Sequence, residues 1–301
     1  MPVIARSTTP LRLAVMVAAL CLLFACSRQP TPMATEPAAN GAAATTQVSI
    51  PNVSSGAGPA GSQGQGPAPQ PGLSPTQGQS GVPAPGPAVP AGAVQPVDIV
   101  TADGVTLAGT FYAPAKPNSP ALIMLHMLDR QRGDWDTLAR TVQAAGYGVL
   151  TIDLRGHGAS GGDREWLKMV DDTADAYAWL ANRPEIDPAH IGVVGASVGA
   201  NLALNFAARE PAVKTVILLS AGLNFRGLAA EPAMKAYGAR PVMLAASAQD
   251  RAAAAVMDRL QKLAQGRQSV LLLQNQGHGT NMLGRENGLE EAILKWLQET
   301  L

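Results

Sequence analysis

The sequence predicts an α/β fold built on a mostly parallel sheet of eight strands, and three observations lead to that prediction. From about Val97 onward, short apolar runs alternate with longer amphipathic segments, the pattern of strands joined by helices. The dipeptide Asp103-Gly104 separates the first two apolar runs, which favours an antiparallel hairpin at the start of the sheet. A glycine-rich turn, residues 195–199, then joins a short apolar strand directly to a helix.

The remaining elements follow from the spacing of the apolar residues. Strands are expected at residues 97–102, 106–113, 121–126, 148–153, 191–196, 215–220, 241–247 and 269–274. Helices are expected at residues 134–145, 165–182, 198–208, 252–265 and 289–301, with Asp171, Asp172 and Asp175 on the solvated face of the second. Residues 221–240 leave room for one short helix and its turns, so any lid is minimal. One domain, residues 96–301, accounts for these elements.

The first 95 residues differ in composition from the rest of the chain. Arg6 and Arg12 precede an apolar run at residues 13–25, which has the length of the apolar region of an export signal rather than of a membrane span. No charged residue occurs from Pro37 to Val97, so this segment cannot bury a core. We therefore expect a signal peptide at residues 1–25 and a disordered tether rich in Pro, Gly and Ala at residues 26–95.

The end of the apolar run, LFAC at residues 23–26, resembles the lipobox at which bacterial lipoproteins are cleaved and acylated. Cys21 and Cys26 are the two cysteines of the chain, which excludes a disulfide framework. The resemblance implies lipidation of Cys26, with a fatty acid such as palmitate, and an exported protein anchored to a bacterial membrane. Ser27 favours the outer membrane, facing the periplasm. The alternatives are an ordinary cleaved signal or an uncleaved anchor.

Ser197 is the candidate nucleophile, because it is the centre of a G-x-S-x-G motif between a strand and a helix. Glycines two residues before and two residues after the serine relieve the crowding of such a turn. The free N–H groups at the start of the helix favour a developing negative charge. The alternative is a glycine-rich turn that carries no nucleophile.

Three further stretches indicate a family. The sequences LIMLHMLDRQRGDW (122–135), IDLRGHGAS (152–160) and QGHG (276–279) resemble the oxyanion-hole loop, the turn after the fourth strand and the histidine loop of the α/β-hydrolase superfamily. The resemblance covers nearly all of residues 97–301. It implies an α/β-hydrolase fold and a serine hydrolase similar to esterases and dienelactone hydrolases.

A serine hydroxyl needs a base that is itself oriented by an acid. By the resemblance, the base is His278 and the acid is Asp250, in the order serine, acid, histidine. A structural role for His278 and a helix-capping role for Asp250 are the alternatives. Of the other histidines, His126 is expected to hold the oxyanion loop by hydrogen bonds and His190 to be solvated.

An oxyanion hole needs two backbone N–H donors. Val198, directly after the nucleophile, supplies one, and Met127 or Leu128 supplies the other. The same loop carries four charged residues, which either bind a polar substrate group or are solvated, with the last of them capping the helix: Asp129, Arg130, Arg132 and Asp134. His157, in the neighbouring turn, is expected to be structural or to line the site.

The sequence also limits the classes of function. Its net charge of zero argues against a nucleic-acid partner, and without metal-ligand spacing or a phosphate loop we expect neither a metal nor a cofactor. The expected activity is cleavage of carboxylic esters of small substrates through an acyl-enzyme on Ser197. A serine aminopeptidase-like peptidase, acting on amides, and a membrane-tethered binding module without chemistry remain alternatives. The oligomeric state is not indicated.

Overall fold

The computed structural model describes residues 87–301, so the expected signal peptide, Cys26 and most of the tether lie outside the described residues. The strands of the main sheet are β1 Val94–Val100, β2 Thr106–Tyr112, β3 Ser119–Leu125, β4 Gly148–Ile152, β5 Ile186–Ala196, β6 Val216–Leu219, β9 Val242–Ser247 and β10 Gln268–Leu273. The α-helices are α1 Asp136–Ala144, α2 Lys168–Ala181, α3 Val198–Arg209, α4 Ala230–Tyr237, α5 Arg251–Leu263 and α6 Leu289–Thr300.

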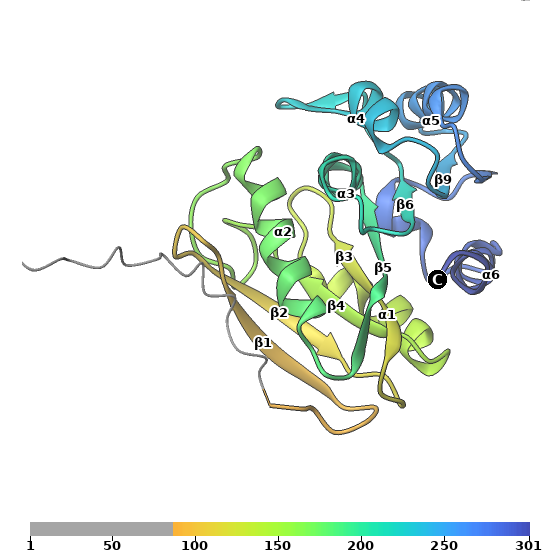
Figure 1. The fold of residues 1–301 in the computed structure, drawn as a ribbon. Coiled ribbons are helices and arrows are strands. Elements are labelled where there is room, and N and C mark those ends of the chain that lie inside the picture. Colours follow the sequence, from red (N-terminus) through yellow and green to blue (C-terminus); the bar gives the residue numbers. More distant parts are fainter. Residues whose placement is uncertain (1–86) are drawn as a thin grey trace, which may run out of the picture. The chain divides into compact units, whose positions relative to one another are not determined.

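Within residues 87–301, these eight strands form one sheet in the order β1-β2-β4-β3-β5-β6-β9-β10 (Figure 1). β2 pairs antiparallel with β1 and with β4. The other neighbouring strands are parallel. The predicted fold class, a mostly parallel eight-stranded α/β sheet with an antiparallel N-terminal hairpin, is confirmed.

Helices cover both faces of the sheet because each strand is apolar on both sides. Along β3, Ile123 and Leu125 pack into the core on the side of α2, α3, α4 and α5. Leu122 and Met124, the alternate residues, pack into the core on the side of α1 and α6. All four side chains have no solvent exposure. This sandwich fixes the positions at which the strands end.

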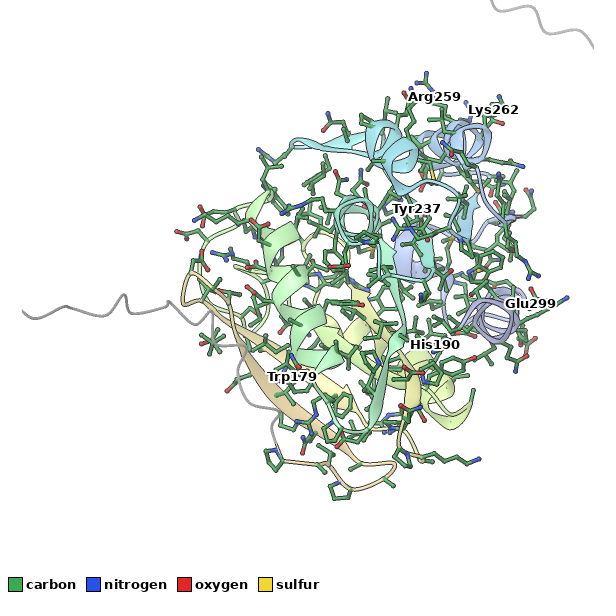
Figure 2. All side chains as sticks on the ribbon, in the orientation of Figure 1. Trp179, His190, Tyr237, Arg259, Lys262 and Glu299 are labelled. Atoms are coloured by element: carbon green, nitrogen blue, oxygen red, sulfur yellow. The ribbon has the colours of Figure 1, made fainter. Side chains whose placement is uncertain are left out.

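The segment between β6 and β9 contains a small hairpin, β7 Asn224–Phe225 with β8 Leu228–Ala229, followed by α4. α4 packs beside α3 and α5 (Figure 1). On α4, Met234 and Tyr237 are buried in the core, and the Tyr237 hydroxyl donates to the carbonyl of Pro241 at 2.7 Å (Figure 2). The minimal lid expected here is therefore one short helix and its turns, plus a hairpin too short to show a strand pattern in the sequence.

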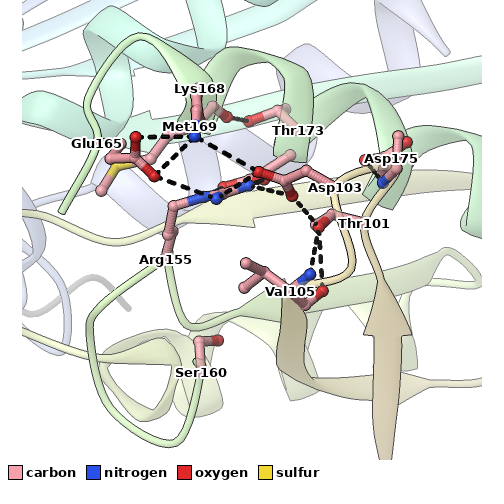
Figure 3. A network of polar contacts seen from close by, with 12 residues as sticks. Thr101, Asp103, Val105, Arg155, Ser160, Glu165, Lys168, Met169, Thr173 and Asp175 are labelled. Atoms are coloured by element: carbon pink, nitrogen blue, oxygen red, sulfur yellow. Dashed lines mark hydrogen bonds and ion pairs between the residues drawn. The ribbon is translucent and has the colours of Figure 1, made fainter. Parts of the chain in front are cut away.

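Arg155, in the turn after β4, joins three separate segments of the chain (Figure 3). Its guanidinium donates to Asp103 in the β1–β2 turn at 2.8 Å and to Asp172 on α2, Nε to Oδ2, at 2.8 Å. The hydrogen bonds that Arg155 donates to Asp172 and Asp103 raise the pKa of Arg155, and the bond to Asp103 lowers the pKa of that carboxyl. Burial raises the pKa of the Asp172 carboxyl, so Asp172 depends on this partner for its charge.

The expectation that Asp172 is solvated is wrong. Asp172 is 2% exposed, whereas its neighbour Asp171 forms an exposed ion pair with Arg209 at 2.7 Å. The side chain of Asp175 accepts a hydrogen bond from the backbone N–H of Ala102. The helical pattern of α2 could not indicate that Arg155, from the turn after β4, contacts Asp172.

These neighbouring aspartates provide a matched test of the Arg155 contact. We expect Asp172→Asn to lower the free energy of unfolding by about 3 kcal/mol, because it leaves a buried guanidinium only partly paired. Asp171→Asn removes an exposed pair and should change it by no more than about 1 kcal/mol. Urea unfolding followed by circular dichroism measures both. Equal effects of the two substitutions would contradict a structural role for the buried pair.

Candidate active site

The topology gathers the loops that follow six strands at one edge of the sheet. β4, β3, β5, β6, β9 and β10 run parallel to one another, so their carboxyl ends share that edge. In open α/β sheets, this edge is where ligands bind. Ser197, Asp250 and His278 follow β5, β9 and β10 respectively. Three residues far apart in the sequence are thus brought to the same side of the molecule.

Ser197 occupies a strained turn between β5 and α3, with φ 53° and ψ −118°. A Cβ on residue 195 would lie 2.1 Å from the carbonyl oxygen of Gly199, and one on residue 199 would lie 2.2 Å from the carbonyl oxygen of Leu125. Both contacts are too close for any side chain, so the two glycines of the motif are required by packing. A non-glycine residue at positive φ is costly and marks a site worth explaining.

The strained turn is held in place by backbone hydrogen bonds on both sides. The N–H of Ser197 donates to the carbonyl of Leu219 in β6 at 2.8 Å. The carbonyl of Ser197 accepts from the N–H groups of Ala200 and Asn201 in α3. The side chain of Ser197 is left at the start of the helix, and the residue is partly exposed. Its hydroxyl is therefore accessible at the sheet edge.

Asp250 and His278 are joined directly. Nδ1 of His278 donates to Oδ2 of Asp250 at 2.5 Å, with side chains that are 45% and 18% exposed. The other carboxylate oxygen of Asp250 accepts from the N–H of Ala253 at 3.3 Å and caps α5. Asp250 thus caps α5, the alternative role considered for it, and contacts His278 with its other oxygen at the same time. The Nδ1 contact leaves Nε2 of His278 as the nitrogen available to a substrate or a nucleophile.

The loop that carries His278 lies against the Ser197 turn. A Cβ on Gly279 would be 3.4 Å from Cβ of Ala196 and 2.7 Å from the sulfur of Met127. Three side chains hold this loop, and the sequence analysis selected neither of the two serines among them and did not expect the contact that Asp134 makes. Ser220 accepts from the N–H of Gly279 at 3.0 Å, Ser247 accepts from the N–H of Gln276 at 3.1 Å, and Asp134 accepts from the hydroxyl of Thr280 at 3.1 Å.

The loop after β3 is held by His126, as expected. Its Nδ1 donates to the carbonyl of Met127 at 2.8 Å, and its Nε2 accepts from the N–H of Leu154 at 2.9 Å. Burial lowers the pKa of His126 to about 4, with the neighbouring His157 adding to this effect, so the ring is neutral at pH 7. Protonation would also break the bond from Leu154. His126 therefore fixes the loop rather than exchanging protons.

The three predicted oxyanion donors lie on the two turns just described. Met127 is 8% exposed, Leu128 is 36% exposed, and Val198, the first residue of α3, is 2% exposed. Among residues 87–301, the N–H groups of these three residues have no hydrogen-bond acceptor. They are consequently free to receive an oxygen of a ligand.

The charged residues of the loop after β3 are paired. Arg130 contacts Asp134 at 2.6 Å and Arg164 contacts Asp129 at 2.7 Å, around an open cleft of about 360 Å³ that His157 also lines. Arg132 is directed elsewhere, to the buried carboxylate of Asp153. The prediction that Asp134 caps the following helix is wrong, since its carboxylate binds Arg130 and Thr280 and α1 has no side-chain cap. This loop is tied to the histidine loop instead.

The two remaining histidines, His157 and His190, make contacts within the fold and none with Asp250. His157 is 4% exposed, donates from Nδ1 to the carbonyl of Arg155 at 2.9 Å and lies between the rings of His126 and Trp166. His190 is exposed and pairs with Asp187 at 2.7 Å, near the amino end of β5 (Figure 2). Both outcomes agree with the sequence analysis.

Residues 87–301 show neither a metal-ligand cluster nor a membrane-spanning helix. The described part of the chain contains no cluster of three or more His, Cys, Asp or Glu side chains arranged to hold a metal ion. Across the same range, no helix combines the length and the apolar character needed to cross a bilayer.

Comparison with known proteins identifies relatives of several activities. The chain is 33% identical over 128 residues to a thiohydrolase of Aspergillus aculeatus, covering 40% of this chain and 39% of that one. It spans about half the length, or less, of the curated relatives it matches. Its fold is similar to that of an α/β hydrolase of a Penicillium species, with a TM-score of 0.60, 16% identity and coverage of 69% and 99% of the two chains. A dienelactone hydrolase of Anabaena variabilis has a TM-score of 0.57, 19% identity and coverage of 69% and 98%.

The family model for the X-Pro dipeptidyl-peptidase (S15) family matches residues 103–299. The matched region includes the Ser197 turn, the loops of Asp250 and His278, and the sheet that positions them. The chain belongs to the X-Pro dipeptidyl-peptidase (S15) family and has the α/β-hydrolase fold.

Proposed function

We propose that the protein is a serine hydrolase that cleaves carboxylic esters of small substrates through an acyl-enzyme on Ser197. The observation that carries this proposal is the hydrogen bond from His278 to Asp250, in a loop that packs against the strained Ser197 turn. A histidine that a carboxylate orients, carried by a loop that packs against the turn of a partly exposed serine, supports nucleophilic acyl transfer with the histidine as the base.

The three residues have different roles in the proposed reaction. Nε2 of His278 takes the proton of the Ser197 hydroxyl as its oxygen attacks the ester carbonyl, and Asp250 holds the ring and stabilises the imidazolium. The tetrahedral oxyanion binds the N–H of Val198 and one N–H of the Met127–Leu128 loop. His278 then protonates the departing alcohol. Water attacks the acyl-enzyme with His278 again as base, which releases the acid and restores the serine.

The family and the neighbours support hydrolysis in general, and the local structure favours small esters. The similar proteins include a thiohydrolase and a dienelactone hydrolase, which are named for acyl-transfer reactions to water. α4 packs beside α3, and Ser197 itself stays partly exposed, so the nucleophile is not deeply enclosed. Small acyl groups need no such enclosure.

Steady-state kinetics with p-nitrophenyl acetate test the assignment of the three residues. We expect Ser197→Ala and His278→Ala to lower kcat by similar, large factors, on the order of 10⁴-fold or more, because such residues act as a unit. Asp250→Asn should cost less than either and still be severe. His190→Gln, which changes an exposed histidine, is the control and should leave kcat unchanged. Near-normal turnover by Asp250→Asn would leave that residue with the helix-cap role alone.

A peptidase is the second candidate, because the family whose model matches the chain is named for an X-Pro dipeptidyl-peptidase, an enzyme that releases X-Pro dipeptides. The same three residues can cleave an amide, since His278 can protonate an amine as well as an alcohol. Comparison of kcat/KM for p-nitrophenyl acetate with that for an Ala-Pro p-nitroanilide separates the candidates. A higher value for the anilide would replace the ester proposal with peptide cleavage.

The length of the acyl chain is a second test of the ester proposal. Leu228 and Met234, which could have lined a groove, are 1% and 0% exposed in the core, and Leu223 is 42% exposed at the surface. Each buried CH₂ contributes about 0.8 kcal/mol, and an open site gains little of it. Over p-nitrophenyl esters from acetate to palmitate, we expect kcat/KM to be highest for the short chains. A maximum at long chains would contradict an open site.

We also propose that the protein is exported and anchored to a bacterial membrane by lipidated Cys26. The substitution Cys26→Ser tests this proposal. The motive is the apolar run before this cysteine and the uncharged segment after it. The substitution removes the thiol that carries the lipid, so the protein should leave the membrane fraction or remain unprocessed. Cys21→Ser, inside the same run, is the matched control and should behave as the wild type. Identical fractionation and migration of all three proteins would exclude the lipid anchor.

A further inference from the structure

Ser220, the residue after β6, combines burial with backbone strain. Among residues 87–301, six non-glycine residues have positive φ: Asn118, Asp129, Ser197, Ser220, Arg226 and Asn275. Four of them are exposed and Ser197 is partly exposed, whereas Ser220, with φ 53°, is 1% exposed. A serine at this conformation is less stable than a glycine, and such strain persists where the surrounding structure requires the residue.

The contacts of Ser220 indicate what it does. Its N–H donates to the carbonyl of Ala245 in β9 at 2.8 Å, which fixes its backbone in the sheet. Its side-chain oxygen accepts from the N–H of Gly279 at 3.0 Å, and Gly279 directly follows His278. The residue before Ser220, Leu219, accepts the N–H of Ser197 at 2.8 Å. Two consecutive residues therefore hold the backbone of Ser197 on one side and that of the His278 loop on the other.

A glycine at position 220 would fit the backbone without strain but would lose the bond to Gly279. The N–H of Gly279 would then be buried without its partner, which is costly. The loop has two other contacts of this kind, in which Ser247 accepts from Gln276 and Asp134 accepts from Thr280. Gln276 and Thr280 each lie two residues from His278 in the sequence. The Ser220 contact is with Gly279, the residue directly after His278 in the sequence. The hydroxyl thus explains why a strained serine occupies this position.

We propose that Ser220 is a positioning residue that sets the place of the His278 imidazole relative to the Ser197 hydroxyl. The proposal rests on the function proposed above for Ser197 and His278. Proton transfer requires the two groups to lie within hydrogen-bond reach of each other. A displacement of about 1 Å can cost about 10²-fold in rate. Ser220 therefore acts on the chemical steps and not on the binding of the ester.

Two substitutions separate the hydroxyl from the strain. Ser220→Gly removes the hydroxyl and relieves the strain, whereas Ser220→Ala removes the hydroxyl and keeps the strain. We expect both to lower kcat for p-nitrophenyl acetate by about 10- to 100-fold per folded molecule, with KM changed by less than about twofold. Ser220→Ala should also be the less stable of the two in urea. Ser119→Ala, which removes a buried hydroxyl at the start of β3, is the control and should leave kcat unchanged.

The outcomes distinguish this inference from the proposed function. If the wild type hydrolyses the ester, Ser197→Ala does not, and Ser220→Gly retains kcat within about twofold, Ser220 has no positioning role and the proposed function stands. If only Ser220→Ala loses activity, strain and not the hydroxyl is responsible, which also overturns the inference. If the wild type is no more active than Ser197→Ala, the proposed function fails and this inference fails with it.

Discussion

The close approach of Gly195 to Gly199, and of Gly199 to the end of β3, is the constraint on which the candidate site depends. A Cβ at Gly195 or Gly199 would lie 2.1 or 2.2 Å from a backbone oxygen, which is too close for any side chain. This contact holds the start of α3 against the sheet and leaves Ser197 at positive φ. Ser197 is the one residue of the turn at residues 195–199 that is not buried. The cost of this conformation is borne by the sheet and helix on either side.

The remaining site residues reach Ser197 through polar contacts between loops. His126 binds the loops after β3 and β4, Ser220 binds the histidine loop to β6, and Asp134 binds it to the loop after β3. Arg155 connects the turn after β4 with α2 and the β1–β2 turn. Irregular segments have few backbone hydrogen bonds of their own, so side-chain contacts such as these define their positions. The sheet sets where the loops begin, and these contacts set where they go.

The sequence predicted the regular parts of the fold well because their signals are local. The eight strands and the hairpin at Asp103-Gly104 follow from apolar runs and turn residues. The Ser197 motif can be recognised in the sequence by its two glycines. The contact of Asp250 with His278 could be anticipated from the order of the motifs, and the structure brings the two together.

What the sequence could not predict depends on long-range contacts. In the sequence, Asp172 has the pattern of any carboxylate on an amphipathic helix, and its contact with Arg155 depends on the fold. Asp134 has the pattern of a helix cap, but it binds Thr280, which lies 146 residues later in the chain. Ser220 is not an acid, so the sequence did not indicate it as a residue that orients His278. A serine that ends a buried strand next to the nucleophile is a weak signal, and only its positive φ and its contact with Gly279 give it meaning.

The central claim is that Ser197 is an activated nucleophile, and covalent labelling tests it most directly. Folded wild-type protein is treated with a fluorophosphonate, digested and mapped by mass spectrometry. The account predicts one adduct, on the peptide and residue of Ser197, and none on Ser197→Ala. An absence of adduct on folded wild-type protein, or an adduct on a different residue, would contradict it.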